Sequence, residues 1–69
     1  MSYKAKILDL EDGEEYYIEL VDESGALIKR TRNFYLLYEI PPYGGEPKYS
    51  GSYSLREIDK LITALQNFT

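Results

Sequence analysis

Apolar and polar residues alternate along much of the chain with the two-residue period that is typical of β-strands. In 34–40, for example, Phe34 and Leu36 fall on one face, and Tyr35 and Leu37 fall on the other. The alternation predicts strands in four segments, with a fifth where Gly and Ser lower the β propensity: 3–10, 15–21, 26–32, 34–40 and, as the fifth, 48–53.

Glycine and proline residues mark the connections between these segments. Asp12-Gly13 is a strong hairpin signal, because the favoured two-residue turn needs a positive φ at both central positions. Pro41-Pro42 ends the strand before it, since proline provides no donor to a β-ladder. The alternation slips out of phase near Ile7, and a β-bulge at that point is the expected explanation.

The C-terminal segment has helical periodicity and predicts a helix over about 55–68. Ser54 and Glu57 have the spacing of a capping box, in which each side chain accepts a hydrogen bond from the other residue's main-chain amide. The apolar stripe of this helix must dock on the sheet, and it consists of Leu55, Ile58, Leu61, Ile62, Leu65 and Phe68.

These elements predict an α+β fold, an antiparallel meander of four or five strands with one C-terminal helix packed on one face. A single helix, about 10 Å wide, covers only one face of such a sheet. The more apolar face is expected beneath the helix, and its members are Tyr16, Ile18, Leu20, Phe34, Leu36, Tyr38 and Ile40. The uncovered face then presents Tyr17, Val21, Tyr35 and Leu37 among Glu19 and Glu39.

Tyrosine is frequent, with eight residues in a chain of 69. A tyrosine ring buries area while its hydroxyl stays in water, and aromatic residues are enriched where proteins meet partners. We therefore expect a partner-binding surface on the uncovered face and the adjoining loops, formed by Tyr17, Tyr35, Leu37, Tyr43 and Tyr49. Ordinary packing of an antiparallel sheet with one wet face is the alternative interpretation.

The composition removes the commonest catalytic and metal-binding side chains. The chain has no Cys and no His, which excludes disulfides and thiolate or imidazole metal sites. The acidic stretch 9–15 lacks the closing Glu of a calcium loop, and the glycine-containing stretch 41–47 lacks the Lys-Ser or Lys-Thr of a phosphate loop. We therefore expect no enzyme activity, no cofactor and no bound metal.

The formal net charge is −4 at pH 7, which disfavours non-specific binding to duplex DNA or to anionic membranes. The sequence has no pattern of a signal peptide or a transmembrane span, and a cytoplasmic location is expected. Arg30 and Arg32 belong to the one basic cluster and point the same way in a strand. They either contact a nucleic-acid strand or an acidic protein patch, or they protect an edge strand from pairing.

The leading hypothesis is a non-catalytic protein-interaction module. The composition is compatible with a homodimer and with a small phage or mobile-element inhibitor that binds a host protein complex. In such an inhibitor, acidic residues on two hairpin tips would mimic phosphates, and these are Asp9, Glu11, Asp12, Glu14, Glu15, Asp22 and Glu23. The alternatives are a homodimer that binds single-stranded nucleic acid and an accessory subunit of a larger enzyme.

The predicted order of elements, a four-stranded antiparallel meander followed by one helix, is similar to that of the transcriptional coactivators that bind single-stranded DNA as dimers. The resemblance covers the order of elements only, and it implies single-strand binding by a sheet that is basic in that family. This chain is acidic instead, with its net charge of −4, and fold order alone does not imply function.

Overall fold

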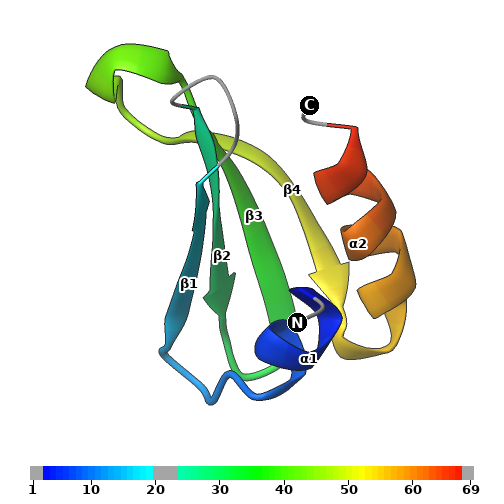
Figure 1. The fold of residues 1–69 in the computed structure, drawn as a ribbon. Helices are drawn as coiled ribbons and strands as arrows, with labels where there is room; N and C mark the ends of the chain where they lie inside the picture. Colours follow the sequence, from blue (N-terminus) through cyan, green and yellow to red (C-terminus); the bar gives the residue numbers. More distant parts are fainter. Residues whose placement is uncertain (1–2, 20–23, 68–69) are drawn as a thin grey trace.

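A computed structural model describes residues 3–19 and 24–67 of the chain. Its elements in chain order are α1 (Tyr3–Leu8), β1 (Glu15–Glu19), β2 (Gly25–Arg30), β3 (Phe34–Ile40), the 3₁₀ turn η1 (Pro42–Gly44), β4 (Lys48–Ser54), the 3₁₀ turn η2 (Leu55–Glu57) and α2 (Ile58–Gln66). The strands form one four-stranded antiparallel sheet in the order β1-β2-β3-β4 (Figure 1). The predicted α+β architecture is confirmed, including a strand at 48–53 and the C-terminal helix.

The first element is a short helix, so the prediction of a strand over 3–10 is wrong. Helical spacing buries Ile7 and brings Leu10, three residues later, against the same core. A strand needs a bulge where the alternation slips, whereas a helix accommodates the slip without one. The Lys4 ammonium also donates to a carboxylate oxygen of Asp59 in α2 at 2.9 Å, which joins the two helices.

Asp12-Gly13 lies in a turn, but this turn joins α1 to β1 instead of joining two strands. Gly13 has φ +89°, a conformation that glycine adopts without a Cβ clash. The Glu14 amide donates to the Glu11 carbonyl at 2.9 Å, and the Glu11 amide donates to the Glu14 carboxylate at 2.6 Å. The acidic stretch of the sequence is therefore a solvated connection with its own hydrogen bonds.

Thr31 closes the connection between β2 and β3. Its amide donates to the Phe34 carbonyl at 2.8 Å, and its hydroxyl oxygen accepts from the Phe34 amide at 3.1 Å. This tight turn pairs Arg30 with Tyr35 and fixes the register of the two strands.

Both helices pack on the same face of the sheet, which we call the inner face. Ile7 of α1 joins three residues of α2 in covering it. The buried core consists of Ile7, Ile18, Ala26, Ile28, Tyr35, Leu37, Ile58, Leu61 and Leu65. Fully burying a large apolar side chain contributes about 1.5–3 kcal/mol before chain entropy is subtracted, so the docked helices are what stabilises this small sheet.

The faces of β3 are the reverse of those predicted. Tyr35 and Leu37 are 3% and 0% exposed, and they lie under the helices instead of on the uncovered face. The register explains this, because Leu37 pairs with Ile28, which in turn pairs with Tyr16, and cross-strand partners share a face. A shift of one residue in register moves every side chain of a strand to the other face.

The capping box at the start of the C-terminal helical segment is confirmed. Ser54 precedes η2, and its amide donates to a Glu57 carboxylate oxygen at 3.1 Å. Of the predicted apolar stripe, Ile58, Leu61 and Leu65 are buried, whereas Leu55 is 37% exposed. Predictions that concern Leu20, Val21, Asp22, Glu23 and Phe68 fall outside the described residues.

No helix within residues 3–19 and 24–67 has the length and apolar character needed to cross a membrane.

Candidate functional site

The sheet face opposite the helices, which we call the outer face, carries a continuous set of apolar and aromatic side chains. Cross-strand pairing places them together, because Tyr17 pairs with Leu27, Leu27 with Tyr38, and Tyr38 with Tyr49. The full apolar set is Tyr17, Leu27, Phe34, Leu36, Tyr38, Ile40 and Tyr49. The described helices both pack on the inner face, so this set lies on the side that they leave uncovered.

Several of these side chains make ordered contacts with one another. The rings of Tyr38 and Tyr49 meet edge to face, with their centroids 5.8 Å apart. The Lys29 ammonium lies 5.3 Å from the centre of the Tyr38 ring, which is within the range of a cation–π contact. The ring of Tyr17 lies over Gly25, where a Cβ would come within 2.8 Å of a ring carbon. The outer face is therefore a structured surface with defined ring positions.

The lengths and the number of the strands set the dimensions of the outer face. The seven residues of β3 extend over about 23 Å, and the four strands span about 14 Å from the first to the last. The resulting footprint is about 300 Å². This footprint is the planar area of the sheet and includes the charged positions Glu15, Glu19 and Lys29, so the apolar set occupies only part of it.

Only some of the predicted partner-binding residues lie on this surface. Tyr17 and Tyr49 are on the outer face, where they are 50% and 61% exposed. Tyr35 and Leu37 are core residues, so they are removed from the candidate site. Tyr43 is 90% exposed but lies in the η1 turn beyond the end of β3.

Tyr43 has an unusual backbone conformation for its residue type. Its φ is 67°, in the left-handed region that glycine and asparagine adopt most easily. The Tyr43 side chain is exposed, and its ring makes none of the ring contacts found among the described residues. It is an exposed aromatic group at one end of the molecule, separate from the outer face.

The two predicted basic contact residues do not form a basic surface with the exposed tyrosines. Arg30 is half-buried, with its guanidinium 5.5 Å from the centre of the Tyr35 ring and a hydrogen bond to the Thr31 carbonyl. Arg32 is exposed in the turn between β2 and β3. The cation that reaches the outer face is Lys29, which the sequence reading did not select.

Most of the outer face differs from the surface that the sequence predicts. The alternation predicts Phe34, Leu36, Tyr38 and Ile40 beneath the helix and places Leu27 on neither face. The available signal is that both alternate sets of β3 carry apolar or aromatic residues, so whichever set the helices do not cover must form an exposed apolar row.

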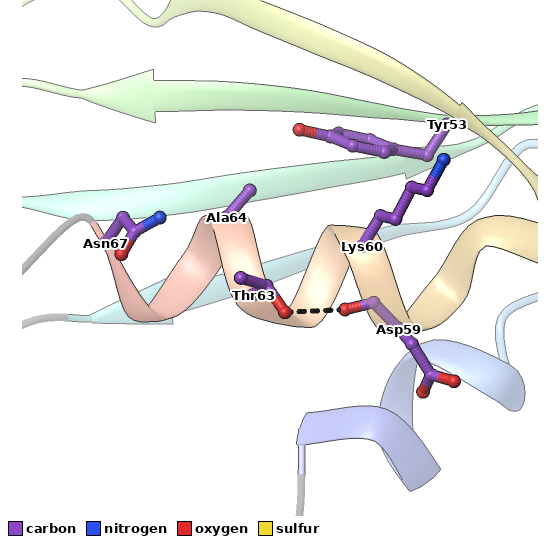
Figure 2. Close-up of a pocket in the computed structure, with 6 residues that line it drawn as sticks. All are labelled: Tyr53, Asp59, Lys60, Thr63, Ala64 and Asn67. Carbon is purple, nitrogen blue, oxygen red and sulfur yellow. Dashed lines mark hydrogen bonds between the residues drawn. The ribbon is translucent and has the colours of Figure 1, made fainter.

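A shallow pocket of about 470 Å³ lies between β4 and α2 (Figure 2), and it is lined by Tyr53, Asp59, Lys60, Thr63, Ala64 and Asn67. Its two charged groups are exposed and already paired. Lys60 contacts Glu57 at 3.1 Å, and Asp59 contacts Lys4 at 2.9 Å. A catalytic lysine or carboxylate is normally activated by burial, whereas the Asp59 and Lys60 side chains are exposed to solvent.

The Glu57 carboxylate has a structural role at the rim of the same region. The hydrogen bond from the Ser54 amide, together with the nearby Lys60 ammonium, holds the pKa of Glu57 below its usual value. This arrangement caps the helical segment. Within the described residues, no group of three or more acidic side chains is placed to hold a metal ion.

Comparison of the chain with protein-family models, with curated proteins and with solved structures gives no match.

Proposed function

We propose that the chain is a non-catalytic module that binds a protein partner through the outer face. The observation that supports this most strongly is the composition of that face on β3. All four outer residues of this strand are apolar or aromatic: Phe34, Leu36, Tyr38 and Ile40. A sheet face that is meant for water normally carries polar residues at these positions.

The chemistry of the face favours a protein over other ligands. Tyrosine and phenylalanine rings supply large contact areas at a low cost in side-chain entropy, and they are enriched at the centres of protein interfaces. The net charge of −4 and the internal contacts of Arg30 argue against a phosphate backbone as the ligand.

Affinity capture from a lysate of the source organism tests this proposal with two matched variants. The first is Phe34→Glu with Tyr49→Glu, which places carboxylates on the outer face. The second is Tyr3→Glu with Leu8→Glu, which makes the same kind of change at exposed apolar residues of α1. A carboxylate buried without a partner is costly, whereas changes at freely exposed sites typically alter stability by about 0.5 kcal/mol or less.

We expect the outer-face variant to lose the captured protein and the α1 variant to retain it, with both proteins folded by circular dichroism. Retention by the outer-face variant would overturn the proposal, as would a captured protein that disappears after nuclease treatment. Identification of the captured protein by mass spectrometry then distinguishes a complex that the module blocks from an enzyme of which it is a subunit.

A further inference from the structure

β1 is one edge of the sheet, and Figure 1 shows no described strand or helix beyond it. An open edge presents main-chain donors and acceptors to any strand that can pair with it. The other edge, β4, is less suited to pairing because its register with β3 shifts between Leu37 and Tyr38, and such irregularities disrupt a regular ladder.

The register identifies which residues of β1 face the open edge. The Arg30 amide donates to the Glu14 carbonyl at 2.8 Å, which marks that pair as hydrogen-bonded. Hydrogen-bonded and non-hydrogen-bonded pairs alternate in an antiparallel ladder. Tyr16 and Ile18 therefore bond to β2, and Glu15, Tyr17 and Glu19 direct their amides and carbonyls outward.

The same three residues also point their side chains to the outer face, since residues at a spacing of two share a face. Glu15 and Glu19 are exposed, and neither forms an ion pair with any described residue. Between them, the ring of Tyr17 lies over Gly25. The open edge thus continues the outer face with an acidic, aromatic, acidic sequence of side chains.

We propose that β1 accepts an extended basic segment of the partner protein as an additional antiparallel strand. The segment carries Lys or Arg at two positions opposite Glu15 and Glu19, with an apolar or aromatic residue opposite Tyr17. This inference rests on the proposed function, because it identifies how the partner reaches the outer face. In this mode of recognition, main-chain hydrogen bonds supply affinity, and alternate side chains supply specificity.

The charges on β1 select this occupant over a second copy of the chain. If two copies of β1 paired antiparallel about Tyr17, Glu15 of each copy would face Glu19 of the other. Directly opposed like charges destabilise a strand pair, and opposite charges stabilise it. The two glutamates therefore discourage self-pairing and favour a basic strand.

The extent of the sheet provides a second reason. Its outer face is only four strands wide. A strand added at β1 widens the sheet and enlarges the contact area next to the tyrosine rings.

The test uses a synthetic peptide in which Lys, Tyr and Lys occupy alternate positions with Thr between them. It is titrated into the isotope-labelled protein to about 1 mM and followed by nuclear magnetic resonance. Binding should shift the amide signals of Glu15, Tyr17 and Glu19 and slow their hydrogen exchange. Two control peptides share its length: one has Glu in place of Lys, and the other is N-methylated at the amides that would face β1.

We expect both controls to bind at least about tenfold more weakly, and a Glu15→Lys, Glu19→Lys variant to prefer the Glu-containing peptide. The inference is overturned if the Lys peptide does not bind or if its N-methylated form binds equally well. It is also overturned if light scattering shows that the protein dimerises and that a Tyr17→Pro variant, which lacks an outward amide of β1, does not. Retained lysate capture by a Glu15→Gln, Glu19→Gln variant, with capture lost in the outer-face variant, would refute this inference while leaving the proposed function intact.

Discussion

Leu36 and Leu37 are adjacent residues of the same type on opposite faces of β3. A comparison of these two residues therefore distinguishes the outer face from the inner face. Leu37 is completely buried, whereas Leu36 lies on the outer face and is only partly buried. Any difference between their substitutions therefore reports the face and not the chemistry of the side chain.

Leu37→Ala is predicted to lower the free energy of unfolding by about 2–5 kcal/mol, because it removes buried methyl groups and leaves a cavity. Leu36→Ala should cost about 1 kcal/mol or less in the isolated protein. Urea melts of the two variants measure both values. Equal losses, or a larger loss for Leu36→Ala, would mean that the faces of β3 are assigned the wrong way round.

The same pair of residues shows why the sequence could not select the face. Both sets of alternate positions on β3 carry apolar residues, with Phe34 and Leu36 on one side and Tyr35 and Leu37 on the other. Glu39, the charged residue of this strand, is in phase with Tyr35 and Leu37, so the alternation marks the buried side as the wet one. The choice is made by pairing, which places Leu37 next to Ile28 under the helices.

At the scale of secondary-structure elements, strong local signals in the sequence predict the type and bounds of an element correctly, and weak signals do not. The boundaries predicted for β3 agree with the structure, since Pro41 ends the strand and Phe34 follows a tight turn. The capping box located the C-terminal helical segment for a similar reason. The segment 3–10 is wrongly predicted as a strand, because the six residues of α1 provide too few turns for a clear helical period. Contacts with α2, which lies far from α1 in the sequence, also support this helix.

The capping box makes a prediction about pH. The Ser54 amide, and then Lys60, stabilise the charged form of Glu57 and lower its pKa in the folded protein. A carboxyl group whose pKa is lower in the folded state stabilises the fold above its unfolded pKa, and this contribution is lost as the pH falls through the folded value. Glu57→Gln keeps an acceptor for the amide but removes the charge.

Urea melts of the wild type and of Glu57→Gln at a series of pH values measure this contribution. The wild type should be the more stable protein at neutral pH, and the difference should shrink steadily as the pH is lowered through the acidic range. A difference that stays constant down to strongly acidic pH would show that the charge of Glu57 does not stabilise the helical segment.

At the scale of the whole molecule, four of the eight Lys and Arg side chains contact other groups of the protein. Lys4 and Lys60 form ion pairs, and Lys29 and Arg30 lie against tyrosine rings. The prediction that Arg30 and Arg32 form a joint contact surface requires both side chains to lack contacts within the protein. The contact of Arg30 could not be inferred without the turn at Thr31, whose carbonyl accepts a hydrogen bond from the Arg30 guanidinium.

This distribution of charge predicts that the protein does not bind single-stranded nucleic acid. A labelled oligonucleotide should show no gel shift at about 50 mM salt, where contacts with phosphates are strong.

The variant Glu15→Lys with Glu19→Lys provides the control, because each substitution raises the net charge by two and the double variant is neutral overall. Its two lysines flank the exposed ring of Tyr17, and lysines beside a stacking ring are the features that single-strand binders use. We expect this variant to gain weak binding that disappears as salt is added, which shows that the assay detects such contacts. The opposite result is that the wild type binds in a salt-sensitive way and that binding is lost in the Arg30→Ala, Arg32→Ala variant. That result would identify the turn between β2 and β3 as a nucleic-acid site. It would contradict the assignment of the outer face to a protein partner.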